Sequence, residues 1–150
     1  SLKIGSINAG ASKKDAHAIY EFGKHMGIAF QLKDDLLDTF GKSDTFGKQV
    51  GRDIISNKKT YLYLRALKDA SEEQKDDLLR YFSFESVSKE ENEQKITHVR
   101  SIFLEMDIPN KTMLIIKKYY QKSLDYLKTI NAGNKDILLD FCNSLIYRDN

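Results

Sequence analysis

The feature that most constrains the fold is an apolar pattern with a helical period, which recurs along most of the 150 residues. From Ser12 to Phe40 apolar side chains return every three or four positions, and Gly41 is a suitable stop. Ser12 and Asp15 resemble a capping box, a common helix start. The sequence contains no convincing pair of alternating strands and no Asn-Gly hairpin. It therefore predicts an all-α fold, a helical bundle.

Further helix starts follow in the second half of the chain. Ser71 with Gln74 and Ser88 with Glu91 both have capping-box spacing. Pro109 suits the first turn of a helix, where its missing N–H costs no hydrogen bond. The remaining signals are a short helix at 50–55, an apolar stripe at Tyr61, Leu62, Leu64 and Leu67, a stop at Gly133 and a cap at Asn134.

Composition limits the classes of partner and compartment. The chain has 24 Lys and Arg against 22 Asp and Glu, so its net charge of +2 gives no general reason to expect a nucleic-acid partner. A single cysteine, Cys142, excludes an intramolecular disulfide and is compatible with a reducing cytoplasm. No apolar run approaches the ~20 residues of a membrane-spanning helix. We expect a single cytoplasmic all-α segment over residues 1–150, with no membrane span.

The most informative segment carries three aspartates. Asp34 and Asp38 are one helical turn apart, Asp35 lies about 100° round the helix, and Gln31 comes one turn earlier. Carboxylates at this spacing repel one another, and a divalent cation would compensate them. Mg²⁺ suits such a set, because it is commonly held by one or two carboxylates together with substrate phosphates. The alternative interpretation is that the acids solvate an exposed helix face.

A glycine-rich loop at 41–59 follows the acids and supplies cations. Lys48 and Lys58 flank Asp53, and lysine is a mobile point charge suited to phosphate. The alternative is that these lysines are merely solvated, and Gly47-Lys48 lacks the preceding glycine pattern of a Walker motif. Acids that hold Mg²⁺ beside lysines that hold phosphate predict a diphosphate site.

Taken together, these motifs resemble a known family. The string Gly27-Ile28-Ala29-Phe30-Gln31-Leu32-Lys33-Asp34-Asp35-Leu36-Leu37-Asp38, followed by Gly47-Lys48, Gly51, Asp53-Ile54 and Asn57-Lys58-Lys59-Thr60, is similar to the second aspartate-rich region of the trans-isoprenyl diphosphate synthases, the polyprenyl synthetase family. The resemblance implies the C-terminal portion of the isoprenoid synthase fold and Mg²⁺ held between two aspartate-rich motifs. It also implies a homodimeric prenyltransferase that condenses an allylic diphosphate with isopentenyl diphosphate to geranyl, farnesyl or geranylgeranyl products.

The resemblance assigns roles by position. Asp34, Asp35 and Asp38 match the catalytic metal-binding acids, and Asp34 is the strongest candidate for a direct ligand. Gln31, Lys48 and Lys58 match the residues near the allylic diphosphate, and Lys48 is also placed among the catalytic residues.

The chain departs from the family in length. Members are much longer, and their first aspartate-rich motif would precede Ser1, so the resemblance implies a partial domain without its N-terminal half. We expect this segment alone to be inactive, because the reacting diphosphate needs metals held from both sides. Two alternatives remain, a non-catalytic helical partner subunit of a synthase and a magnesium-dependent phosphohydrolase. The product chain length stays open.

Two other patterns have simpler explanations. His17, Glu21 and His25 stand four residues apart, a spacing open to zinc, but no fourth ligand is evident and surface polarity is favoured. Cys142 has apolar neighbours and no identifiable base, so a buried small residue is favoured over a nucleophile.

Overall fold

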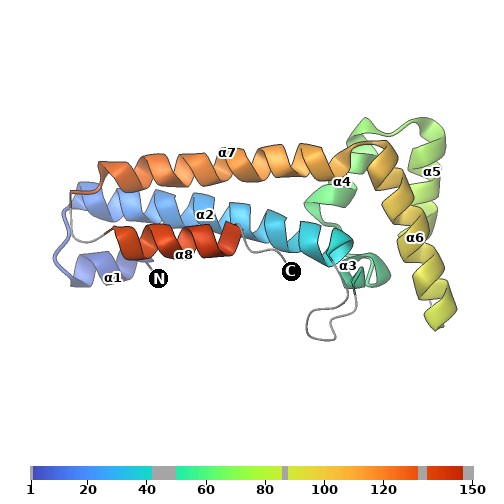
Figure 1. The fold of residues 1–150 in the computed structure, drawn as a ribbon, viewed down its shortest axis with the longest axis horizontal. Coiled ribbons are helices and arrows are strands. Elements are labelled where there is room, and N and C mark those ends of the chain that lie inside the picture. The colour runs from blue at the N-terminus through green and yellow to red at the C-terminus, as the bar shows by residue number, and fades with distance from the viewer. Residues whose placement is uncertain (1, 42–49, 86–87, 132–134, 147–150) are drawn as a thin grey trace. The chain divides into compact units, whose positions relative to one another are not determined.

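The computed structural model describes residues 2–41, 50–85, 88–131 and 135–146, and within these ranges it holds helices and no strand. The all-α prediction is therefore confirmed. The helices in chain order (Figure 1) are α1 (Leu2–Asn8), α2 (Lys13–Phe40), α3 (Arg52–Ile55), α4 (Tyr61–Asp69), α5 (Glu72–Tyr81), α6 (Lys89–Glu105), α7 (Ile108–Thr129) and α8 (Asp136–Ile146).

The chain divides into two compact units. The first combines residues 1–33 with residues 114–149, and the second comprises residues 34–113. The long helices α2 and α7 each contribute one part to each unit. The interpretation of residues 1–150 as one domain stays a prediction.

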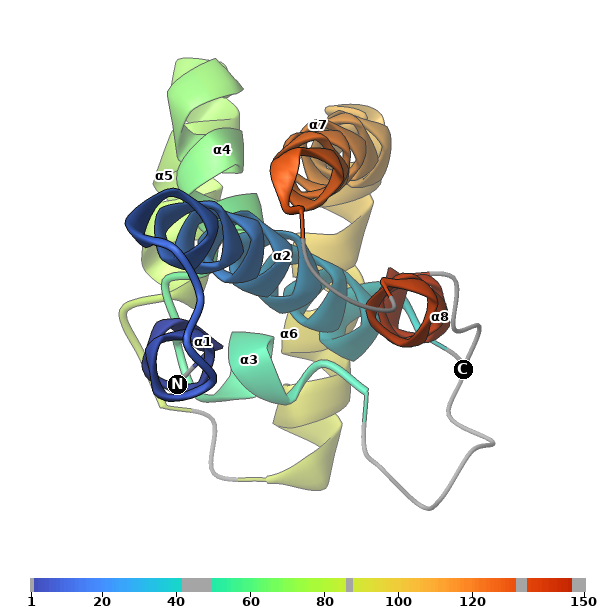
Figure 2. The same ribbon diagram turned by 90° about the vertical axis from the view of Figure 1, so that its left-hand side faces the viewer.

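The first unit packs α1 and α8 with the long parts of α2 and α7, and α7 and α8 are seen nearly end-on in Figure 2. Its core consists of apolar side chains from three helices, since the inward positions recur every three or four residues. The Asp15 carboxylate, at the start of α2, accepts the Asn131 N–H just after α7 at 3.2 Å. The core side chains are Phe22, Met26, Ala29, Ile116, Leu127, Cys142 and Ile146.

The second unit joins the last turns of α2 to α3, α4, α5, α6 and the start of α7. Within it, α5 packs on α4 and α6, and the short α3 packs on α6. The rings of Tyr63 and Phe82 stack with centroids 4.1 Å apart. This unit buries Leu62, Leu78, Val99, Phe103 and Ile108.

Four predicted helix starts are confirmed. Ser71 accepts the Gln74 N–H and the Gln74 side chain accepts the Ser71 N–H, a complete capping box. The Ser88 side chain accepts the Glu91 N–H at 3.1 Å. Pro109 is the second residue of α7, as its lack of an N–H allows. Ser12 likewise accepts the Asp15 N–H before α2.

Two details differ from the sequence prediction. The helix α1 was not predicted, because seven residues with a central glycine give a weak signal. The buried side of α4 is formed by Leu62, Tyr63 and Ala66, whereas Leu64 is 54% exposed, so the stripe predicted around Leu64 is wrong. The predicted stop at Gly133 and cap at Asn134 lie outside the described residues.

Candidate functional site

The three aspartates lie on the last turns of α2 and differ in their burial. Asp35 is only 6% exposed, Asp38 is half-buried and Asp34 is exposed. The difference follows from helix geometry, because adjacent positions are about 100° apart and only one side of α2 faces its own unit. Asp35 and Asp38, one turn apart, therefore point toward the second unit.

The segment that begins α3 is fixed directly to Asp38. Gly51 donates its N–H to the Asp38 carbonyl, and Asp53 donates its N–H to Asp38 Oδ2 at 2.9 Å. Arg52 Nε lies 3.7 Å from the other oxygen, Oδ1. Gly51 has a φ of 85°, in the left-handed region that favours glycine, and this allows the sharp entry into α3. Asp53 is thereby held beside α2.

Lys58 joins the two acidic segments. Its Nζ lies 3.1 Å from Asp35 Oδ1 and 2.8 Å from Asp53 Oδ2. These two carboxylates, with the Asp53 hydrogen bond as the larger effect, raise the pKa of the Lys58 ammonium above its usual range. The side chain is about half exposed, so the ammonium is both paired and reachable from solvent.

Burial disfavours the charged form of Asp38. Desolvation raises the pKa of its carboxyl group, and the nearby Asp53 carboxylate adds to that rise, while the Asp53 N–H opposes it. A cation at this carboxylate would stabilise its charged form and so oppose the effect of burial. The donor chemistry fits Mg²⁺, because carboxylate oxygens are its preferred protein ligands.

The part of the chain that the structure describes holds no group of three or more histidine, cysteine, aspartate or glutamate side chains placed to share one metal ion. The three acids therefore do not form a complete cage by themselves. One or two carboxylates with open positions is the usual arrangement for Mg²⁺ that also binds substrate phosphates.

The structure brings together only some of the residues predicted for the site. Asp35, Asp38 and Lys58 meet within the second unit through Asp53. Asp34 and Gln31 lie on exposed positions of α2, and Lys59 is exposed next to Lys58. Lys48 lies outside the described residues.

Two contributors were missing from the predicted set. Asp53 lies between the lysines and has no predicted role, although it accepts from Lys58 and donates its N–H to Asp38. Lys95 has no predicted role either, and it is fully buried against the same segment. Its sequence signal is its place in the apolar stripe of α6, with Val99 and Phe103 four and eight residues later.

The alternative patterns have structural explanations. His25 is buried rather than on the surface, with Nδ1 2.7 Å from the Glu21 carbonyl and its ring against Tyr126. The expectation of surface polarity is therefore wrong for His25, whereas His17 is exposed. Cys142 is buried, as expected, and its burial raises the pKa of the thiol.

No helix in the described ranges has the length and hydropathy needed to span a bilayer. The cytoplasmic location stays a prediction.

Comparison with known proteins identifies relatives of the chain. The sequence model of the family described as polyprenyl synthetase matches residues 1–101. The geranylgeranyl diphosphate synthase of Sulfolobus acidocaldarius is 31% identical over 132 residues, 88% of this chain and 38% of that protein. The short chain isoprenyl diphosphate synthase of Methanocaldococcus jannaschii is 36% identical over 96 residues, 64% of this chain and 29% of that protein.

A solved structure agrees with these relatives. The crystal structure of a geranylgeranyl pyrophosphate synthase matches with a TM-score of 0.87 and 35% sequence identity, over 99% of this chain and 46% of that chain. The present chain thus spans less than half the length of each of these relatives. The family match extends over more than half of the chain and confirms the resemblance carried by the aspartate-rich segment. The chain belongs to the polyprenyl synthetase family.

Proposed function

We propose that this chain supplies the second aspartate-rich half-site of a prenyltransferase that condenses an allylic diphosphate with isopentenyl diphosphate. The observation that carries the proposal is the cluster of Asp35, Asp38, Asp53 and Lys58, in which carboxylates and an ammonium meet at one end of α2. Family membership and the names of the relatives support the reaction class.

The acids act on the charge of the diphosphate through a bound cation. Asp34, Asp35 and Asp38 are proposed to contact Mg²⁺ directly or through water, and the half-buried Asp38 is suited to this role because a cation offsets its desolvation. Bound Mg²⁺ would neutralise negative charge that develops on the departing diphosphate. Asp53 keeps Asp38 in place through its N–H.

The lysines are proposed to bind the diphosphate itself. Lys58 is reachable from solvent and firmly protonated, so it offers a positive charge to an entering anion. Lys48 and Gln31 are assigned to the same task from the family motif. Charged hydrogen bonds of this kind contribute about 1.5–3 kcal/mol each, or roughly ten-fold to more than a hundred-fold in affinity.

The proposal is tested by calorimetric titration of dimethylallyl diphosphate into the chain, with and without Mg²⁺. We expect Mg²⁺-dependent binding that weakens about ten-fold or more in Asp38→Asn and in Lys58→Met. Asp76→Asn on an exposed position of α5 and Lys59→Met beside Lys58 are matched controls, which should bind like the unchanged chain. Equal binding by all variants, or binding indifferent to Mg²⁺, would contradict the proposal.

A product assay with both diphosphates separates the alternatives. Elongated prenyl diphosphate supports the transferase, whereas release of phosphate or diphosphate without an acceptor supports a phosphohydrolase. Metal-dependent binding without turnover is the expected result for this 150-residue chain. The homodimer implied by the family stays a prediction, which light scattering of the purified protein would test.

A further inference from the structure

Lys95 of α6 is a fully buried lysine with three oxygen acceptors. Its Nζ donates to Asn57 Oδ1 at 2.6 Å and to the Phe84 carbonyl at 3.1 Å, and the Ile55 carbonyl lies at 3.5 Å. An ammonium has three N–H donors, so these three oxygens match its full hydrogen-bonding capacity. The buried ammonium is therefore fully hydrogen-bonded within the fold.

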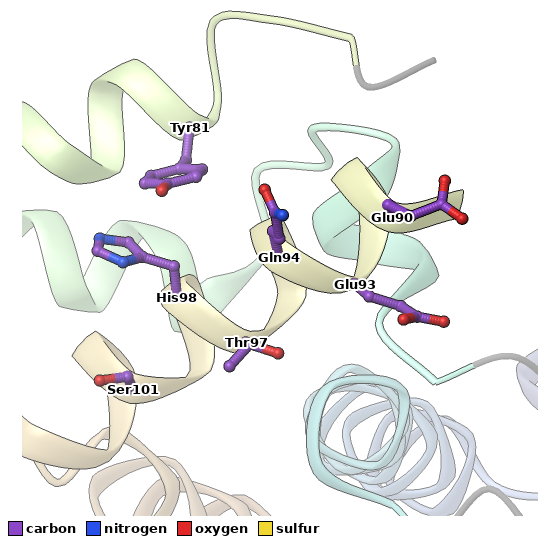
Figure 3. Close-up of a pocket in the computed structure, with 7 residues that line it drawn as sticks. All are labelled: Tyr81, Glu90, Glu93, Gln94, Thr97, His98 and Ser101. Carbon is purple, nitrogen blue, oxygen red and sulfur yellow. The ribbon is translucent and has the colours of Figure 1, made fainter. Parts of the chain in front are cut away.

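The two sides of α6 show that Lys95 occupies an apolar position. Its inward stripe otherwise consists of Val99, Ile102 and Phe103. The opposite side lines a shallow open groove with polar side chains, among them Gln94, Thr97 and His98, and the His98 ring stacks on Tyr81 at 4.4 Å (Figure 3). Packing alone would favour an apolar side chain at this inward position, because burying a charge costs free energy.

Two of the three oxygens that Lys95 binds, those of Ile55 and Asn57, belong to the turn that presents Lys58. Asn57 has a φ of 56°, the left-handed conformation, and its side-chain amide donates to the same Phe84 carbonyl at 3.0 Å. Ile55 ends α3, and Lys58 follows Asn57 directly. The ammonium thus ties the end of α3 and the left-handed residue to the segment that follows α5.

The neighbouring residue of α6 supports the other end of the same segment. The Ile96 side chain packs so closely on Gly51 that a Cβ at Gly51 would lie 2.8 Å from two of its carbons. Gly51 is the residue whose N–H binds the Asp38 carbonyl. Ile96 and Lys95, consecutive residues of α6, therefore contact the start and the end of the 51–58 segment.

We propose that Lys95 is a positioning residue for diphosphate binding, which acts through Asn57 to keep the Lys58 ammonium between Asp35 and Asp53. The inference rests on the proposed function of the site, and it adds a residue that the aspartate-rich motif does not contain. Preorganising a charged group before the ligand arrives removes an ordering cost from binding. Burial also lowers the pKa of the Lys95 ammonium, and the negative charge of Glu85 opposes that shift.

The first experiment measures the reactivity of Lys58 in the free protein. An amine-modifying reagent is applied at mildly alkaline pH, and modification of each lysine is followed by peptide mass spectrometry. In Lys95→Met we expect Lys58 to be modified about ten-fold faster, because its ammonium is then held less firmly against Asp35 and Asp53 and is more often open to the reagent. Lys59 should react at an unchanged rate. The matched control is Gln94→Met, which introduces the same residue at an exposed position on the outer side of α6.

The second experiment is a double-mutant cycle on the binding of inorganic diphosphate with Mg²⁺. Lys95→Met should weaken binding about ten-fold when Lys58 is present, and less than about two-fold in the Lys58→Met background. A merely structural role would weaken binding equally in both backgrounds. That result, or an unchanged Lys58 modification rate in a folded variant, overturns the proposal.

The two experiments separate this inference from the proposed function. If the unchanged chain fails to bind diphosphate, the proposed function fails, while the modification rate of Lys58 still decides whether Lys95 positions it. If Lys95→Met does not fold, Asn57→Gly serves instead, because glycine adopts the left-handed φ readily and the change removes the side-chain contacts to Lys95 and to the Phe84 carbonyl. It should raise the modification rate of Lys58 in the same way.

Discussion

Replacing Gly51 by alanine is expected to destabilise the second unit strongly. Gly51 has a φ of 85°, and an added Cβ would lie 2.8 Å from Ile96 Cδ1 and Cγ1 and 3.1 Å from Cγ2. Placing an L-residue in the left-handed region costs about 1–2 kcal/mol. Overpacking of this kind costs about 1–3 kcal/mol more. The sum is about 2–5 kcal/mol, a large share of a typical domain stability of about 5–15 kcal/mol.

The two contributions can be separated by a second substitution. Ile96→Ala removes all three carbon atoms that the new Cβ would meet, so the double variant should retain only the conformational cost of about 1–2 kcal/mol relative to Ile96→Ala alone. The difference between the two backgrounds measures the steric part. Urea unfolding followed by circular dichroism gives each free energy.

Gly27→Ala is the matched control, and it should change the unfolding free energy in the opposite direction. Gly27 lies inside α2, and a Cβ there would meet nothing within 4 Å. Alanine should therefore increase the unfolding free energy by about 0.5–1 kcal/mol. A loss below about 0.5 kcal/mol for Gly51→Ala would refute the argument, since both the left-handed strain and the clash would then be absent in solution.

Three further predictions concern stability. Ser71→Ala removes the capping box of α5 and should lower the unfolding free energy by about 1 kcal/mol in urea titrations. Phe103→Ala removes a core side chain that is only 1% exposed and should lower the unfolding free energy by about 3–5 kcal/mol in the same assay. Lys111 and then Arg65 lower the pKa of Asp69 below its usual 3.8. The unchanged protein should therefore be more stable than Asp69→Asn above pH 3.8, and this difference should disappear as the pH falls through the folded-state pKa. Acid unfolding of both proteins measures the difference.

Local signals account for the parts of the fold that were predicted. The capping box at Ser71 and Gln74 is formed within four residues, and it determines where α5 begins whatever packs around it. The helix α1 has no such signal. Leu2 lies over Gly23 of α2, where a Cβ would be 2.7 Å from Leu2 Cδ1, so α1 is supported by a contact twenty-one residues away.

The same distinction explains the candidate site. Asp35, Asp38 and Lys58 belong to a recognisable motif, and their types and spacing suggested a joint role. Which acid is buried depends on the side of α2 that packs, and this is a tertiary property. Lys95 binds Asn57 across thirty-eight residues of sequence, and its position in an apolar stripe was its only local sign.

The ion pairs around Lys58 have a consequence for the order in which ligands bind. The acids Asp34, Asp35, Asp38 and Asp53 outnumber the cations Arg52 and Lys58 by two, so the cluster repels a free anion. One divalent cation offsets this excess of negative charge and so removes the repulsion that a diphosphate meets. The cation should therefore enter first or already bound to the diphosphate, and association of the bare anion should be the slowest route.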